Sequence, residues 1–460
     1  MEETELLDSS YRSLSFWHDS LQESLSPRPI SGRRNFDVLV LGAGYTGLWT
    51  ALYLLRQKPD LKIGIIEKEI AGFGASGRNG GWCSALFPWS AELISQRYGK
   101  DQAIAIRKAM VATVDEIGSI TRELGISCDF QKAGTINLVR NSAQLKRAES
   151  EIEQAKEFGV DQLGFLEPGL LPKASSAITA VFDPACASIQ PAKLVRGLAR
   201  KVEELGGEIF EKTEVLDFFS GLVKTTRGDF HGEYIVDALE GYRPLLPRRK
   251  REFLPLYSLM IVTEPISPEL LDEIGLVQGI TFADFRNLII YGQRTKDNRI
   301  AFGGRGAPYH FGSSVKAEYD TVEKIHVFLE KELKDLFPQL KEVKITHNWG
   351  GALGVARDWM TSVRLDSVTK IGQAGGYVGD GVGTSNLAGR TMADLILGNQ
   401  SDLTALAFVN HRSPRWEVEP FRFIAARGAM LAARIADVIE RSTGRQSFIT
   451  SIIRFLTGKR

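Results

Sequence analysis

A glycine-rich turn between an apolar strand and a helix constrains this chain most. Residues 36–41 (FDVLVL) form a short continuous apolar run, which is typical of a buried parallel strand. Residues 42–47 (GAGYTG) follow and lead into the helical pattern of residues 46–57. A second apolar run, residues 62–69 (KIGIIEKE), comes after the helix and ends in an acid. This order predicts a strand–helix–strand unit of a parallel sheet.

The glycines of this turn have the spacing of a dinucleotide-binding motif. Gly42 permits the tight turn, Gly44 lets the backbone approach a pyrophosphate, and Gly47 permits close packing of helix on strand. Glu67 ends the second strand, where an acid can accept hydrogen bonds from ribose hydroxyls. A glycine-rich turn without a ligand is the alternative. We expect an adenine dinucleotide to contact Gly42, Gly44, Tyr45, Thr46, Gly47, Glu67 and Lys68.

A second glycine-rich loop, residues 71–81 (AGFGASGRNGG), distinguishes between cofactors. A dinucleotide fold that serves only a nicotinamide does not need such a loop, whereas a flavin does. Its backbone amides can follow the ribityl chain and the isoalloxazine edge, with Arg78 and Asn79 near phosphate or flavin polar atoms. The loop therefore predicts FAD, held by Gly74, Ala75, Ser76, Arg78, Asn79, Gly80 and Gly81.

The glycines of the chain gather in a further region, far along the sequence. Of 45 glycines, the window from Gly42 to Gly81 holds 9 and the window from Gly350 to Gly389 holds 10. We expect residues 375–390 to bring a loop against the flavin before a helix begins near Thr384, with the positive helix end toward the ring. The predicted contacts are Gly376, Gly379, Gly381, Val382 and Thr384, with Val215 from an earlier strand.

The remaining patterns predict an α/β (α+β composite) fold. It consists of a Rossmann-type FAD-binding domain of discontinuous segments and an interleaved antiparallel-sheet substrate domain. Apolar spacing predicts helices over 91–125, 142–158 and 315–337 and from 194 to Gly206–Gly207. Strands are expected within 129–140, 223–239, 257–266, 287–294 and 299–305. We expect an extension over 1–35, the FAD-binding domain over 36–90, 185–245 and 340–400, the substrate domain over 91–184 and 246–339, and a helical segment over 401–460.

The composition of the chain indicates which classes of partner it is not expected to bind. There are 57 Lys and Arg against 56 Asp and Glu, a net charge of +1, so no nucleic-acid partner is expected. The three cysteines and six histidines show no metal-ligand spacing, which predicts no metal site and favours a reducing cytoplasm. No long apolar run indicates a membrane span. Residues 447–460 (SFITSIIRFLTGKR) predict an amphipathic helix, which packs on its own protein or docks on a membrane surface.

The motifs resemble those of the D-amino-acid oxidase (DAO) superfamily of FAD-dependent oxidoreductases, in particular its gamma-glutamylputrescine oxidase-like branch. GAGYTG, IGIIEKE and GFGASGRNGG carry the resemblance, and residues 375–396 are similar to the branch's C-terminal flavin motif. FPQL (337–340) and NWGG (348–351) recur there as well, so the resemblance runs from about Phe36 to about Gly398. Two departures concern the substrate. Asp380 stands where the putrescine-pathway enzymes are expected to have a histidine, and VDALEGY (236–242) is looser than the family segment.

The resemblance implies the chemistry. A neutral amine or amino acid is oxidised by hydride transfer from its α-carbon to flavin N5, and the resulting imine hydrolyses. Molecular oxygen or another acceptor then reoxidises the flavin, and no metal, catalytic triad or protein nucleophile takes part. Two alternatives stay open: a flavoprotein dehydrogenase of a non-amine donor such as a hydroxy acid, and a flavin-binding scaffold with little turnover.

Substrate contacts are expected from the antiparallel domain. Tyr257 and Tyr291 are candidates for cation–π attraction to an amine, and Arg305 for a substrate carboxylate. Trp349 is a candidate to cover the flavin ring. For each, the alternative is a core aromatic residue or a surface arginine. Cys83 follows the GRNGG loop, but a small buried thiol is the commoner role, so FAD is expected to be non-covalent.

Overall fold

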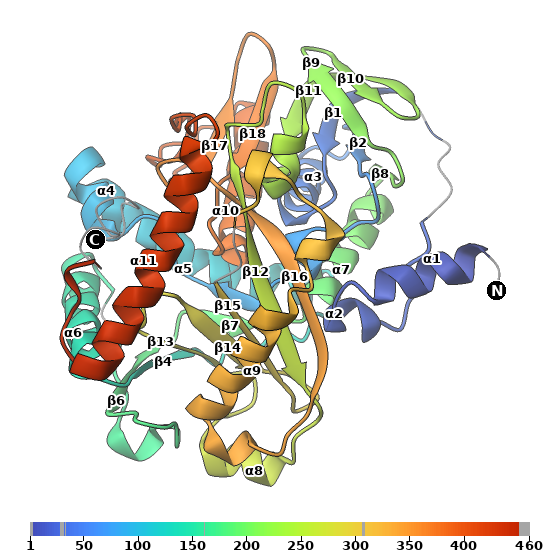
Figure 1. The fold of residues 1–460 in the computed structure, drawn as a ribbon. Helices are drawn as coiled ribbons and strands as arrows, with labels where there is room; N and C mark the ends of the chain where they lie inside the picture. The colour runs from blue at the N-terminus through green and yellow to red at the C-terminus, as the bar shows by residue number, and fades with distance from the viewer. Residues whose placement is uncertain (1–2, 28–31, 33, 161, 306–308, 450–460) are drawn as a thin grey trace.

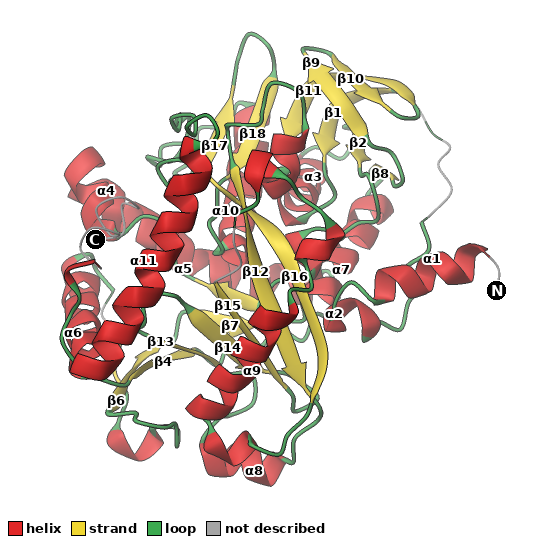
Figure 2. Ribbon diagram, viewed as in Figure 1, coloured by secondary structure: helices red, strands yellow, loops and turns green. Residues whose placement is uncertain are grey.

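Two eight-stranded sheets form the body of the computed structural model, which describes residues 3–27, 32, 34–160, 162–305 and 309–449. In Figure 1 the first sheet lies in the upper part of the molecule and the second in the lower part, with helices packed around both (Figure 2). The helices are α1 (Glu3–Arg12), α2 (Phe16–Asp19), α3 (Tyr45–Gln57), α4 (Ala91–Tyr98), α5 (Lys100–Glu123), α6 (Ser142–Glu157), α7 (Pro191–Glu204), α8 (Pro268–Ile274), α9 (Glu323–Leu336), α10 (Gly381–Leu397) and α11 (Phe421–Thr443).

The first sheet has the order β17-β18-β11-β1-β2-β8, with β10 paired to β11 and β9 paired to β10. Its strands are β1 (Asn35–Leu41), β2 (Ile63–Ile66), β8 (Glu208–Phe210), β9 (Val215–Phe219), β10 (Leu222–Thr225), β11 (Gly228–Asp237), β17 (Ser362–Leu365) and β18 (Ile371–Gly375). β1 pairs in parallel with both β2 and β11, and β11 pairs in parallel with β18. The predicted Rossmann-type sheet of discontinuous segments is confirmed.

The second sheet has the order β16-β12-β15-β14-β13-β4-β6-β5, antiparallel except for the β4–β13 pair. Its strands are β4 (Thr135–Val139), β5 (Gly164–Phe165), β6 (Thr179–Asp183), β12 (Leu254–Thr263), β13 (Thr281–Asp284), β14 (Ile290–Arg294), β15 (Ile300–Arg305) and β16 (Ile345–Val355). A small sheet pairs β3 (Trp82–Ser84) with β7 (Cys186–Ser188). β14 pairs with β15 and β10 pairs with β11, each as an antiparallel hairpin, in the regions where the sequence predicts strands.

Two predicted helices differ from the structure. The helix expected over 91–125 is divided at Gly99, whose φ of +93° interrupts it between α4 and α5. The helix expected over 315–337 begins only at Glu323. The residues before it make tertiary contacts instead: Tyr319 stacks on the ring of His310, and Asp320 forms an ion pair with Arg78. The spacing of apolar residues within a segment does not indicate contacts with residues far away in the chain.

The chain after residue 340 contributes strands to both sheets and forms helices α10 and α11. Residues 340–400 are shared between the sheets, because β16 pairs along its length with β12 while β17 and β18 belong to the first sheet. The domain boundaries themselves stay a prediction. In the C-terminal segment the helix is α11, and most of the amphipathic stretch 447–460 lies outside the described residues. Within the described chain, no helix has the length and apolar character needed to cross a membrane.

Candidate cofactor and substrate site

The N-terminus of α3 has the form of an anion-binding turn. Gly42 has a φ of +99°, and a Cβ on Gly47 would lie 2.1 Å from the carbonyl oxygen of Gly42, so only glycine fits there. Gly44 precedes the helix and offers no side chain to cap it, and the first turn carries no acid. Tyr45 N–H donates to Ser76 Oγ at 2.9 Å, which brings the second predicted loop to this helix end. The amides here can receive a phosphate group.

Glu67 lies at the carboxyl end of β2, beside this turn. Its Oε2 accepts a hydrogen bond from Ala43 N–H and its Oε1 accepts one from Glu69 N–H, both at 2.9 Å. Burial raises the pKa of Glu67 to about 7. Lys68 lies apart from this group, since it forms an exposed ion pair with Glu214 at 2.8 Å. Val215 packs in an apolar cluster with Phe210 and with Ile66, the last residue of β2 before Glu67.

The loop 71–81 is held in shape by its own side chains. Asn79 Nδ2 donates to the carbonyl oxygens of Ala75 and Ser76, both at 3.1 Å, and Asn79 Oδ1 accepts from Gly81 N–H at 2.8 Å. Arg78 turns toward the second sheet instead of lying open at the loop. Its Nε donates to Phe73 O at 2.7 Å, and its Nη1 lies 2.6 Å from Asp320 Oδ2. These contacts engage the Nε and Nη1 atoms of the guanidinium group.

The second glycine window joins the first in space. Tyr377 OH and Thr46 Oγ1 are hydrogen-bonded at 2.8 Å, so the loop before α10 meets the first turn of α3. A Cβ on Gly389 would lie 2.6 Å from the Cβ of Trp49, so α10 packs closely on α3. Gly376 and Gly379, with φ of +81° and +102°, allow the sharp course of this loop.

At the start of α10, a side chain bonds to the backbone of the same turn. Thr384 Oγ1 donates to Asp380 O at 2.6 Å within the first turn. Asp380 is the N-cap residue, but its side chain does not cap the helix. The first turn carries no acid, as at α3, and Gly381 and Val382 begin it. Two helix N-termini whose first turns carry no acid thus lie at the meeting point of the two windows, and Asp380 at the N-cap of α10 is the acid beside them.

Glu240 belongs to this site, although the sequence analysis did not single it out. It follows β11 with a φ of +46°, and burial raises its pKa to about 7. Its Oε1 accepts hydrogen bonds from Gly376 N–H at 3.1 Å and Tyr377 N–H at 3.3 Å, and its Oε2 accepts one from Gly354 N–H. The carboxyl group therefore joins the loop before α10 to β16. The only signal in the sequence was the departure of VDALEGY from the family pattern.

The contact of the N-terminal extension with the loop 71–81 is a second feature that the sequence did not predict. Trp17 is buried, and its Nε1 donates to Asn79 O at 2.8 Å. Ser15 Oγ donates to Gly77 O at 3.0 Å. α2 therefore supports the loop 71–81 from the side of the second sheet. A short FWHD helix carries no periodic pattern that indicates this contact.

The substrate candidates separate into two groups. Tyr291 reaches the loop: a Cβ on Gly80 would lie 2.4 Å from its ring, and its hydroxyl is 2.7 Å from Ser258 Oγ. Tyr257 is the neighbour of Ser258 on β12. The side chains of neighbouring residues point to opposite faces of a strand, so Tyr257 lies on the face away from Ser258 and Tyr291. Its ring is edge-on to His310, and its hydroxyl bonds to the backbone of Lys316. The structure does not bring Tyr257 together with Tyr291.

Trp349 and Arg305 are the other two residues that the sequence predicts near the flavin or the substrate. Trp349 is almost fully buried among the aromatic residues under the loop, with its ring edge-on to Trp17 and its Nε1 donating to Arg78 O at 2.8 Å. It acts as a support for the loop in this structure. Arg305 ends β15, opposite Ser258, and its side chain lies outside the described part of the chain.

The described residues fit an FAD molecule. The cradle at α3 exists only because glycine stands at positions 42 and 47, and a hydroxyl and a carboxyl group flank it, at Ser76 and Glu67. Cys83 is fully buried, and burial raises the pKa of its thiol well above the ordinary value. Among the residues that the structure describes, no group of three or more His, Cys, Asp or Glu side chains is arranged to hold a metal ion.

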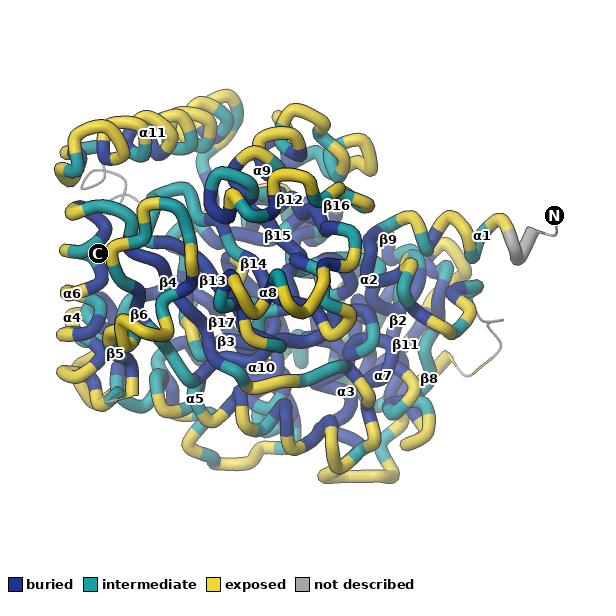
Figure 3. The backbone as a smooth tube through the Cα atoms, turned by 90° about the horizontal axis from the view of Figure 1, so that it is seen from below, coloured by how far each residue is buried: buried dark blue, intermediate teal, exposed yellow. Residues whose placement is uncertain are grey.

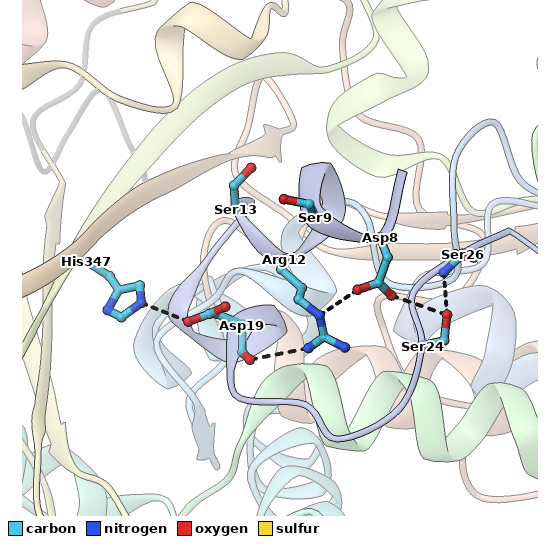
Figure 4. Close-up of a pocket in the computed structure, with 8 residues that line it drawn as sticks. All are labelled: Asp8, Ser9, Arg12, Ser13, Asp19, Ser24, Ser26 and His347. Atoms are coloured by element: carbon cyan, nitrogen blue, oxygen red, sulfur yellow. Dashed lines mark hydrogen bonds and ion pairs between the residues drawn. The ribbon is translucent and has the colours of Figure 1, made fainter. Parts of the chain in front are cut away.

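A surface cavity of about 760 Å³ lies elsewhere, between the N-terminal helices and β16 (Figure 4). Its polar groups mainly bond to one another or to nearby backbone: Arg12 pairs with Asp8 at 2.6 Å, and His347 Nε2 lies 3.2 Å from Asp19 Oδ2. We do not assign the cofactor to this cavity, since neither glycine window lines it. The lining residues are Asp8, Ser9, Arg12, Ser13, Asp19, Ser24, Ser26 and His347.

Comparison with known proteins agrees with this geometry. A family model described as "FAD dependent oxidoreductase" (DAO) matches residues 37–395. Gamma-glutamylputrescine oxidoreductase of Escherichia coli is 30% identical over 402 residues, which cover 85% of this chain and 89% of that protein. A probable oxidoreductase, OrdL, of Haemophilus influenzae is 29% identical over 410 residues, again covering 85% and 89%.

Solved structures share the fold. Glycine oxidase from Geobacillus kaustophilus superposes with a TM-score of 0.69 at 19% identity, covering 83% of this chain and all of that one. L-amino acid deaminase from Proteus myxofaciens superposes with a TM-score of 0.67 at 16% identity, covering 83% and 94%. The similarity thus extends over both sheets.

Proposed function

Because the chain belongs to the DAO family of FAD-dependent oxidoreductases, we propose that it oxidises an amine or amino acid at the carbon next to nitrogen. One observation of the structure supports this most directly: the two glycine windows meet through the hydrogen bond between Thr46 and Tyr377. The relatives named for gamma-glutamylputrescine and for glycine point to CH–NH or CH–NH₂ donors. The departures at Asp380 and Glu240 leave the particular donor open.

The residues that would hold FAD follow from the site. The amides at the start of α3 and the Ser76 hydroxyl would receive the pyrophosphate, and Glu67 would accept hydrogen bonds from ribose hydroxyls. The loop 71–81 and the second glycine window would flank the flavin. When bound, FAD would take the two electrons and the hydrogen of the donor's C–H bond as a hydride at N5, and oxygen or another acceptor would reoxidise it.

The chain itself has mainly to position the donor and keep water out. Tyr291 and Ser258 present hydroxyl groups beside Gly80, where the second sheet faces the loop 71–81. An amine docked there would bind in its neutral form, with its C–H bond toward the ring. After hydride loss its N–H proton passes to solvent, and the imine reacts with water to a carbonyl compound and a free amine. No nucleophile of the chain is needed in these reaction steps.

We expect FAD to be non-covalent and the protein to act in the cytoplasm. The thiol of Cys83 is buried and has a raised pKa, which disfavours the thiolate that a thioether link would require. Denaturation in acid should therefore release all yellow colour into the supernatant after precipitation. Colour that stays with the polypeptide would contradict the non-covalent assignment.

The test of the function is an anaerobic reduction screen of the purified, FAD-loaded protein. Amines, N-methyl amino acids, D-amino acids and hydroxy acids are mixed with it separately, and loss of the flavin absorbance is followed. The proposal predicts bleaching by at least one nitrogen donor. Bleaching by hydroxy acids alone would show a dehydrogenase of a non-amine donor, and no bleaching by any compound would favour a scaffold with little turnover. A protein that cannot be loaded with FAD would refute the cofactor assignment.

A further inference from the structure

The helix α11 lies on the outside of the molecule and buries only one of its faces. Arg422, Ala433, Ala436 and Glu440 point inward and are buried. Glu440 forms an ion pair with Arg147 at 2.6 Å, and Asp437 accepts hydrogen bonds from the backbone of Asn287 and Leu288. These contacts fix which face of α11 is turned to the protein. In Figure 3 the helix runs along the upper edge of the molecule, with exposed positions on its outer side.

The outward face carries a row of large apolar side chains. Ile424, Leu431 and Val438 follow one another at a spacing of seven residues, with 62%, 59% and 68% of their surface exposed. A seven-residue spacing places side chains nearly above one another on a helix. Phe421 and Ile435 are exposed beside this row. Such a contiguous apolar stripe on a surface helix marks an interaction site.

A second row runs parallel to the first and is cationic. Arg427, Arg434 and Arg441 each come three residues after a member of the apolar row, and all three are exposed. Both acidic residues of α11, Asp437 and Glu440, are among the inward contacts described above. Arg427 donates to Tyr309 O at 3.2 Å, and Arg441 lies 3.9 Å from Asp335 on α9. The outer face of α11 therefore combines apolar side chains with positive charge and presents no acid of its own.

The apolar row and the arginine row together indicate which partner fits the outer face of α11. If a second copy of the chain packed its α11 on this face, two arginine rows would come together with no acid on the outer face of either helix, which is unfavourable. An anionic lipid surface instead offers an apolar layer for the first row and negative charge for the second. The residues beyond the described chain continue the composition in sequence, since 450–460 carry Arg454, Lys459 and Arg460 and no acid.

We propose that α11 docks the protein on the surface of an anionic phospholipid bilayer, with the Ile424–Leu431–Val438 row in the interface and the arginine row at the headgroups. The helix lies in the plane of the membrane and does not cross it. The proposal is independent of the enzyme's substrate, because α11 contributes none of the residues assigned to FAD or to the donor.

The experiment is co-sedimentation of the FAD-loaded full chain with vesicles of phosphatidylcholine, with and without phosphatidylglycerol. One variant replaces the cations, Arg427→Gln with Arg434→Gln and Arg441→Gln, and another replaces the apolar row, Ile424→Ser with Leu431→Ser and Val438→Ser. A matched control carries Leu170→Ser, Ile178→Ser and Val368→Ser, three exposed apolar residues elsewhere on the surface. Circular dichroism and FAD content check that each variant folds.

We expect binding to vesicles that contain phosphatidylglycerol and little to phosphatidylcholine alone. Each arginine near an anionic surface contributes about fivefold, so the arginine variant should bind about 100-fold more weakly. The serine variant of α11 should lose binding as well, while the control should bind like wild type. Equal binding by wild type and both α11 variants, or by both vesicle types, would overturn the proposal. A lipid-independent dimer that only the α11 variants lose would overturn it in favour of a second copy.

Discussion

Removal of the Asp320 carboxyl group should destabilise the protein more than removal of any exposed acid near it. Arg78 and Asp320 join the loop 71–81 to the segment before α9, and their Nη1 and Oδ2 atoms lie 2.6 Å apart. Only 2% of the Arg78 side chain is exposed, and its Nη2 has no hydrogen-bond partner among the residues that the structure describes. In Asp320→Ala the guanidinium group stays buried with a hydrogen bond to Phe73 O and the ring of Phe73 beneath it.

The magnitude follows from this burial. Leaving one partner of a buried pair without the other costs about 3–5 kcal/mol. Asp320→Asn keeps an oxygen that accepts from Arg78 and should cost less. The double variant with Arg78→Met leaves no buried charge, so its loss should be smaller than the sum of the two single losses.

Urea unfolding of the apoprotein, followed by tryptophan fluorescence, measures these differences. Glu318→Ala is the matched control, because Glu318 forms an exposed pair with Lys316 two residues before Asp320 and should change stability little. If Asp320→Ala resembles Glu318→Ala, or if the two single losses simply add, the ion pair does not hold the loop. If Arg78→Met instead weakens FAD binding and leaves apoprotein stability intact, the original expectation of a phosphate or flavin contact is correct.

Three further changes test other parts of the site. Gly47→Ala places a methyl group 2.1 Å from Gly42 O, and overpacking of about 1–3 kcal/mol should weaken FAD binding roughly 5- to 150-fold. Gly428→Ala, whose methyl group meets open space, is the control, and equal FAD affinity in both variants would refute the cradle. Trp17→Ala should cost about 3–5 kcal/mol of unfolding free energy and lower FAD affinity, since it removes a buried support of Asn79; unchanged FAD titration would show that α2 is not a support. For Glu240, whose pKa is raised from 4.5 to about 7, the folded state holds its proton more tightly than the unfolded state. Wild type should therefore lose stability relative to Glu240→Gln as pH rises from 4.5 to 7, and a difference that is constant over this range would refute the shift.

The parts of the fold that the sequence predicted are those that local patterns define. The strand, turn, helix and strand around GAGYTG, and the helix expected to begin near Thr384, appear as β1, α3, β2 and α10. Their meeting could be predicted because both windows fit one cofactor. In the same way, the β14 and β15 hairpin follows from two apolar runs separated by a short polar turn.

What could not be predicted depends on contacts between distant residues. The residues NWGGALGV lie in β16, which pairs with residues of β12 that stand 87 to 101 positions earlier in the chain. Glu240 gains its role only when Gly354 and Gly376 come near it. Trp17 reaches Asn79 through the tertiary fold alone. No spacing rule within a single segment indicates such pairs.

The most direct test of the central claim is a single-turnover reaction without oxygen, with the nitrogen donor that the screen identifies. We predict that flavin absorbance falls in step with the formation of one carbonyl product per flavin. Deuterium at the donor's α-carbon should slow this step, because the C–H bond breaks in it. Flavin that bleaches without a carbonyl product, or a donor oxidised at the same rate with either isotope when chemistry is rate-limiting, would contradict oxidation by hydride transfer at that carbon.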